Sequence, residues 1–219
     1  MSFTIRRRVV GAVLLVSATS IPSVVAEISA KAALEGLQSW LDGTRQLESR
    51  FEQELLSGAL GAGLAERGTL YVSRPGRMRW DYKDPEVKIA LIDQGRMRLY
   101  LAEDRQLIVS EIPEEGDLLP TLLTGTGRLA TLFEPEIVEE SAGERTVLLR
   151  LVPRDRVDSF EEVLLSLRAK TWEIDRALVM DAAGNRMEYR FSRLRRNRPI
   201  AEEVFSFDPP PGTEIIDQP

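Results

Sequence analysis

The pattern that decides the fold stands in residues 69–82, which read TLYVSRPGRMRWDY. Apolar and polar side chains alternate over residues 69–72 and again over residues 78–82, and a period of two is typical of β-strands. Residues 74–77, RPGR, have the composition of a tight turn. The stretch therefore predicts two antiparallel strands joined as a hairpin.

One face of the second strand is apolar. Met78, Trp80 and Tyr82 fall on that face, with charged residues on the other. Residues 186–191, RMEYRF, show the same arrangement, with one apolar and one charged face. A sheet with a large apolar face must bury it. Either a second sheet packs against this face, or the sheet curves and helices cover its concave side. The second arrangement can leave an apolar cavity.

The remaining pattern predicts one large antiparallel sheet with few helices. Residues 27–45 place apolar side chains three and four positions apart, as in an amphipathic helix that ends at Asp42-Gly43. The leucine-rich residues 111–135 interrupt the strands and predict one or two short helices. Further strands are expected at residues 87–92, 96–101, 106–110, 136–140, 145–152, 160–169, 171–181, 186–194 and 205–207. A sheet of this length can curl on itself, and residues 27–219 are expected to form a single domain.

Residues 1–26 have the layout of an export signal. Three arginines precede an apolar run at residues 9–18, and Val24-Val25-Ala26 offers small residues for cleavage. The alternative is an N-terminal membrane anchor, for which the apolar run is short. Cleavage after Ala26 leaves 26 basic and 35 acidic side chains, a net charge of −9, which disfavours nucleic acid as a partner. We expect an exported, soluble, periplasmic protein.

The 219 residues include no Cys and no His. Their absence excludes a disulfide framework, a thiolate nucleophile, a Cys-based zinc site and a Ser-His-Asp triad. It also removes the side chain that most often acts as a general base near neutral pH. We therefore expect no enzyme activity, no cofactor and no metal.

Two polar features have both a structural and a functional interpretation. Arg74 shares a strand face with Leu70 and Val72, so its guanidinium must reach solvent, pair with an acid or bond carbonyl oxygens. The second feature is a basic cluster, which is either a solvated hairpin end or a docking patch for an acidic partner. The cluster consists of Arg193, Arg195, Arg196 and Arg198.

An ordered set of motifs resembles one family across the mature chain. The longest is G-x-L-x-V-x-R-P-x-x-x-x-W-x-Y-x-x-P at residues 68–85. The others are Phe51-x-Gln53, Asp93-x-Gly95 with Tyr100, Asp181-x-x-Gly184, and F-x-F-x-x-P-x-G at residues 205–212. Together they resemble the outer-membrane lipoprotein carrier family, LolA. A related lipoprotein receptor, LolB, shares the fold but carries a lipidated Cys, so the absence of Cys favours the carrier.

The resemblance implies an incomplete, half-open β-barrel with a helical lid over an apolar cavity. It implies a chaperone that takes acylated lipoproteins from an inner-membrane lipoprotein-releasing ABC transporter complex to an outer-membrane receptor. We expect the carrier to be a monomer. Arg74 falls on the family's arginine, which is held to lock the lid, and Met78 falls where some carriers have an aromatic residue.

The resemblance and the alternation together give two sets of candidate site residues, although an aromatic and Met stripe also suits plain core. The expected acyl-chain cavity comprises Leu70, Val72, Met78, Trp80, Tyr82, Leu91, Leu99, Met187, Tyr189 and Phe191. The expected lid comprises Leu119, Leu122, Leu123, Leu132 and Phe133. The competing function is a periplasmic lipid or glycolipid binder or sensor on the same fold.

Overall fold

The structure is a computed structural model. It describes residues 28–57, 61–93, 95–111, 122–124, 127–140, 146–155, 160–181 and 184–218. The expected export signal and Leu119 lie outside these residues. No helix in the described ranges is both long enough and apolar enough to span a membrane.

Most of the described residues lie in strands, as the alternation predicts. The helices are α1 (Ala30–Asp42), α3 (Leu129–Leu132) and the 3-10 helix η1 (Glu202–Phe205), with a further helical turn at residues 122–124. The strands are β1 (Gln46–Ser57), β2 (Gly61–Ser73), β3 (Arg77–Asp84), β4 (Lys88–Asp93), β5 (Arg96–Leu101), β6 (Gln106–Glu111), β7 (Phe133–Glu140), β8 (Thr146–Pro153), β9 (Glu162–Arg168), β10 (Ile174–Met180), β11 (Arg186–Arg196) and β12 (Glu214–Asp217).

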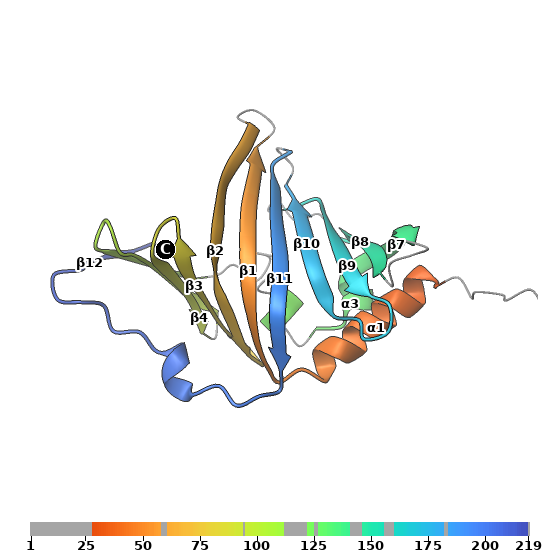
Figure 1. The fold of residues 1–219 in the computed structure, drawn as a ribbon, viewed down its shortest axis with the longest axis horizontal. Coiled ribbons are helices and arrows are strands. Elements are labelled where there is room, and N and C mark those ends of the chain that lie inside the picture. The colour runs from red at the N-terminus through yellow and green to blue at the C-terminus, as the bar shows by residue number, and fades with distance from the viewer. Residues whose placement is uncertain are drawn as a thin grey trace, which may run out of the picture.

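All twelve of these strands belong to one sheet, in the order β12-β6-β5-β4-β3-β2-β1-β11-β10-β9-β8-β7. Every neighbouring pair is antiparallel except β12 and β6, which run parallel. The sheet curves into a half-pipe with its two wings on either side of β1 and β11 (Figure 1). The expected curved, open, mainly β architecture is confirmed.

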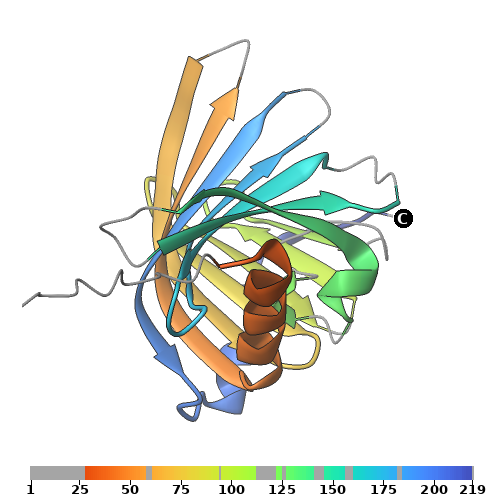
Figure 2. The ribbon, with the colours of Figure 1, turned by 90° about the vertical axis from the view of Figure 1, so that its right-hand side faces the viewer.

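Helix α1 lies inside the curve of the sheet (Figure 2). Its N-terminus is capped by Ser29, whose side chain accepts a hydrogen bond from the Ala32 amide at 3.2 Å. Its apolar stripe is buried and joins the core of the sheet; the stripe consists of Ala33, Leu34, Leu37, Trp40 and Leu41. The expected amphipathic helix is thus present, and it covers part of the concave face.

The convex face is also covered over β3 to β6. The chain after β11 runs past these strands to β12 (Figure 1) and buries Phe205 against them. The Arg79 guanidinium donates to the carbonyl oxygens of Val204 and Ser206, and the Phe207 ring lies 4.9 Å from that of Tyr100. We call residues 199–213 the C-terminal strap, since they bind the sheet from outside.

The strap corrects one expectation, because residues 205–207 do not form a strand. Phe205 ends η1, Ser206 after it is extended, and Phe207 pairs with none of the described strands. The apolar residues at positions 205 and 207 resemble a strand pattern because both rings turn toward the convex face of the sheet. The last strand is instead β12, which begins at Glu214 in the tail that follows the strap.

At position 68 of β2, the close approach of β3 leaves room only for glycine. A Cβ atom on Gly68 would lie 2.0 Å from the Asp81 carbonyl oxygen and 2.7 Å from the Phe51 ring. We expect Gly68→Ala to lower the free energy of unfolding by about 1–3 kcal/mol, because the strands must separate to admit the methyl group. Urea unfolding measures the change. Gly127→Ala is the control, since among the described residues its Cβ would meet only Leu132 at 3.4 Å, and equal losses in both variants would contradict this account.

Candidate functional site

A wall of aromatic rings lines the centre of the concave face. Trp80 lies edge-on to Phe51 at 4.6 Å between ring centroids, and 5.5 Å from Tyr189. Tyr189 in turn stacks on Phe191 at 6.4 Å. The Trp80 indole N–H donates to Met78 Sδ at 2.9 Å, so Met78 supports the wall from the same strand. Strands β1, β3 and β11 thus bring their aromatic residues to one apolar surface.

On one side of this wall the concave face is hollow. The hollow has a volume of about 270 Å³. It is lined by Gln53, Trp80, Tyr82, Lys88, Ala90, Ile92, Met97, Leu99, Met187 and Tyr189. Ligand pockets generally have volumes of about 300–1,000 Å³, so the hollow falls just below that range. It could accept part of an apolar chain without any rearrangement.

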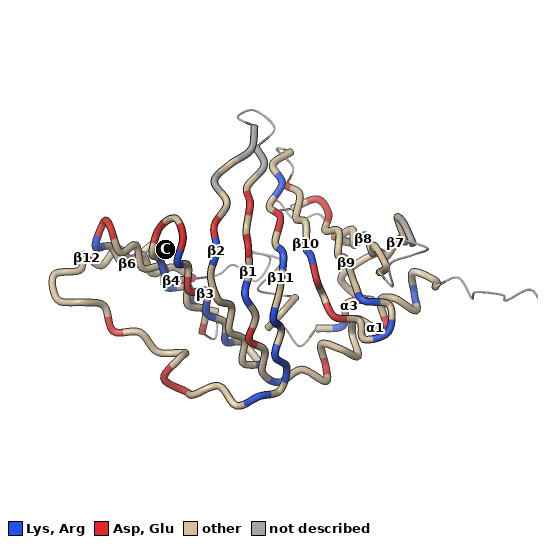
Figure 3. Tube along the Cα trace, viewed as in Figure 1, with Lys and Arg blue, Asp and Glu red and all other residues tan. Residues whose placement is uncertain are grey.

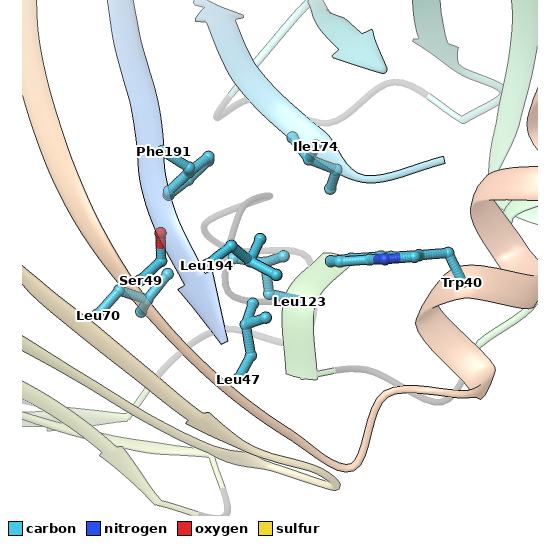
Figure 4. A pocket seen from close by; sticks show the side chains of 8 residues that line it. All are labelled: Trp40, Leu47, Ser49, Leu70, Leu123, Ile174, Phe191 and Leu194. Atoms are coloured by element: carbon cyan, nitrogen blue, oxygen red, sulfur yellow. The ribbon is translucent and has the colours of Figure 1, made fainter. Parts of the chain in front are cut away.

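On the other side of the wall the interior is filled. Trp40 of α1 and Leu123 of the helical turn point toward Leu70, Ile174 and other side chains of the sheet (Figure 4). The space left among these side chains is about 10 Å³. Helix α1 and the turn at residues 122–124 therefore occupy the volume that a larger apolar ligand would need.

Gln38 joins α1 to the segment that follows the helical turn. Its side-chain oxygen accepts a hydrogen bond from the Leu129 amide at 2.8 Å, and its side-chain nitrogen donates to the Gly127 carbonyl at 3.5 Å. The turn itself is held to the β2–β3 hairpin, because the Gly76 amide donates to the Thr124 carbonyl at 3.3 Å. These polar contacts fasten the cover over the filled interior, which we call the lid (α1 with residues 122–124 and 127–132).

Arg74 lies where the lid meets the sheet. It lines a small cavity of about 60 Å³ together with Gln38 and Leu41 of α1 and with Leu122 and Leu129. Burial lowers the pKa of the Arg74 guanidinium, and the Asp42 carboxylate at the end of α1 acts in the opposite direction. Arginine keeps its charge under such conditions, so Arg74 places a cation beside the lid.

The structure brings together nine of the ten expected cavity residues. Leu70, Val72, Met78 and Trp80 are buried in the concave core, with Tyr82, Tyr189 and Phe191 packed against it. Leu99 and Met187 line the hollow. The shared concave surface follows from the strand register, which puts Leu70 opposite Trp80 and Val72 opposite Met78.

Leu91 lies on the opposite face of the sheet from the expected one. It stands opposite Arg79 and Arg98 in the register, and these arginines bond the strap on the convex side. Its neighbours Ala90 and Ile92 line the hollow instead. Leu91 is buried beneath the strap, so its burial reflects packing on the outside of the sheet.

The expected lid residues are only partly in the lid's interior. Leu122 and Leu123 are buried in the core, as expected, whereas Leu119 is outside the described residues. Leu132 is 43% exposed. Phe133 is buried but begins strand β7, so it belongs to the sheet on which the lid rests.

All four arginines of the basic cluster are exposed, and two of them, Arg195 and Arg196, also bond neighbouring parts of the structure. The Arg196 guanidinium donates to the Trp40 carbonyl at 3.2 Å and to the Thr44 hydroxyl at 2.7 Å, which satisfies the end of α1. Arg195 pairs with Glu48 at 3.4 Å. Arg193 and Arg198 are exposed. Acidic and basic residues are interspersed along β1, β11 and β10 (Figure 3), so the cluster continues a mixed surface.

Sequence reasoning missed Trp40 and Gln38 as site residues. Trp40 belongs to the apolar stripe of a helix, which is ordinarily interpreted as core. Gln38 is a polar residue two positions before it, and no spacing rule connects it with residues 127–129. The only sequence feature that could have marked Gln38 as a site residue was its position on α1, one turn before the helix ends.

Gln38→Leu should loosen the segment at residues 127–132. The substitution removes both of its hydrogen bonds to that segment, each contributing about 0.5–1.5 kcal/mol. Amide hydrogen exchange at Leu129 should therefore accelerate, while exchange in the central strand β1 stays unchanged. Unaltered exchange at Leu129 would show that the Gln38 contacts do not hold the segment.

Comparison with known proteins gives a consistent result. The family described as "Outer membrane lipoprotein carrier protein LolA" matches residues 42–208. The outer-membrane lipoprotein carrier protein of Pseudomonas paraeruginosa is 26% identical over 206 residues, covering 94% of this chain and 97% of the relative. That of Methylobacillus flagellatus is 28% identical over 205 residues, covering 92% and 98%.

A solved structure supports the fold alone. An uncharacterized conserved protein from Thermus thermophilus superposes with a TM-score of 0.53 at 12% identity. The match covers 86% of this chain and 99% of that chain. The two proteins therefore share the curved sheet although their sequence identity is too low to indicate a relationship.

Proposed function

The chain belongs to the outer-membrane lipoprotein carrier family LolA, and from this premise we propose that it carries acylated lipoproteins through the periplasm. The acyl chains bind to the concave face of the sheet. The cargo comes from an inner-membrane lipoprotein-releasing ABC transporter complex and goes to an outer-membrane receptor. Residues 1–26 direct export and are removed, and residues 27–219 act as one carrier domain.

The observation that carries the proposal is the divided interior. The aromatic wall has a hollow of about 270 Å³ on one side and a filled volume on the other, with only about 10 Å³ left. Exposing an acyl chain to water costs roughly 0.8 kcal/mol per methylene, so a carrier must provide apolar surface along the chain. Opening the lid would extend the hollow into the filled half.

The lid allows the carrier to release its cargo. In the closed state Trp40, Leu122 and Leu123 make the contacts that acyl chains would otherwise make, and Arg74 stabilises this arrangement. Cargo replaces these contacts and opens the lid. The free energy of the closed state is subtracted from cargo affinity, so the net hold on the cargo stays limited. No covalent bond is made or broken in this cycle.

The test uses the mature protein and inner-membrane vesicles that contain labelled lipoproteins and their transporter. After incubation with ATP, the vesicles are sedimented and the soluble fraction is analysed. We expect labelled lipoprotein to leave the vesicles in complex with the protein. If phospholipid or glycolipid leaves and lipoprotein does not, the competing function of a lipid binder or sensor is supported instead.

A further inference from the structure

A charged pair lies at one edge of the hollow. Lys88 of β4 and Glu66 of β2 form an ion pair of 2.5 Å, and their side chains are only 22% and 19% exposed. Lys88 lines the hollow. Glu66 lies opposite Gln53 in the strand register, which places it on the same concave face. A charged pair on an apolar ligand-binding surface needs an explanation beyond solubility.

The surrounding contacts fix the position of this pair. The Lys88 ammonium group lies 4.3 Å from the centre of the Tyr82 ring, and the Tyr82 hydroxyl donates to Gln53 Oε1 at 2.8 Å. These four side chains form a polar edge, while the hollow continues beside them as an apolar wall that includes Trp80, Ala90 and Ile92. A ligand with chains and a polar head would therefore place its chains along the wall and its head at the polar edge.

The charge of the pair decides which head is accepted. The Lys88 ammonium has three donors, so it can bond Glu66 and still donate to an ester carbonyl. The Glu66 carboxylate cancels the positive charge and repels an anion nearby. In a lipoprotein, the groups next to the acyl chains are uncharged esters and amides. In an anionic bilayer lipid, the headgroup next to the acyl chains carries a charged phosphate.

From these contacts we infer that Lys88 and Glu66 determine headgroup specificity, admitting the uncharged acyl linkage of a lipoprotein and rejecting the phosphate of anionic phospholipid. The inference rests on the proposed function and adds the selection of cargo from a surrounding bilayer. Glu66 is the residue that discriminates. Without it, Lys88 loses its acidic partner beside the hollow and attracts phosphate.

Displacement of an apolar fluorescent probe measures the effect with two ligands. One is a triacylated lipopeptide with an uncharged peptide, and the other is short-chain phosphatidylglycerol. We expect Glu66→Gln to raise affinity for phosphatidylglycerol relative to lipopeptide about tenfold, equivalent to about 1.4 kcal/mol. Lys88→Gln should act in the opposite direction and lower affinity for phosphatidylglycerol, which keeps the inference testable if one variant folds poorly.

Glu52→Gln is the matched control. Glu52 pairs with Arg67 at 3.2 Å, and it precedes the hollow residue Gln53, so its side chain points to the convex face. The control loses the same charge and should keep the wild-type preference. If lipopeptide binds the wild type but neither Glu66→Gln nor Lys88→Gln changes phosphatidylglycerol affinity, the inference is wrong and the proposed function stands. If the wild type binds phosphatidylglycerol but no lipopeptide, both are wrong.

Discussion

Arg74→Leu should retain cargo that the wild type releases to the receptor. The substitution removes the cation that lies beside the lid, near Asp42 and the cavity shared with Gln38. A loss of about 1.4 kcal/mol from the closed state would raise net cargo affinity about tenfold. Transfer of labelled lipoprotein from the carrier to receptor-containing outer-membrane vesicles measures the effect, and transfer should be slower or incomplete.

Arg45→Leu provides the control for this experiment. Arg45 is exposed and lines a surface groove beside Arg74, but it does not line the cavity under the lid. Its replacement removes the same charge from the same region and should leave transfer unchanged. Normal transfer by Arg74→Leu would reject the role of Arg74 as a lock, and impaired transfer by both variants would indicate a general effect of charge.

Trp40→Ala should destabilise the empty protein and improve binding of apolar ligands. Trp40 is buried in the filled half of the interior, and its removal is expected to cost about 3–5 kcal/mol of unfolding free energy. The space it leaves joins the volume available to acyl chains. Saturating ligand should therefore raise the melting temperature of this variant more than that of the wild type.

Phe205→Ala separates this effect from loss of stability alone. Phe205 is buried on the convex face, outside the concave core, so its removal creates no space for an acyl chain. We expect a lower melting temperature with an ordinary response to ligand. An equal ligand response in both variants would contradict the assignment of Trp40 to the ligand volume.

The alternation around Trp80 predicted a sheet with one apolar face and left its curvature as one of two options, which the family resemblance decided, but β1 was missed. Its inward positions include Ser49 and Gln53, which interrupt the apolar pattern. Ser49 donates to the Ser192 carbonyl at 2.9 Å, and Gln53 accepts from Tyr82. Polar groups that find partners can face a core, and those partners lie far away in the sequence.

Leu91 shows a second limit of pattern reading. Strand β4 reads KIALID, in which both faces carry apolar residues. The pattern therefore cannot show which face of β4 points to the concave side of the sheet. The reason for two apolar faces is the C-terminal strap, whose position depends on contacts with Arg79 and Arg98. The lid residues were hard to assign for a similar reason. An apolar residue such as Phe133 suits a lid helix as well as a buried strand, and the pattern could not show that it begins β7.

The central claim is that acyl chains bind to the concave face, and photo-crosslinking tests it most directly. Benzoylphenylalanine replaces either Tyr82, which lines the hollow, or Tyr100, which packs under Phe207 on the convex face. Each variant is loaded with lipoprotein that carries labelled acyl chains and is then irradiated. We predict labelled adducts at position 82 and none at position 100. Adducts at position 100 with none at position 82 would contradict the account.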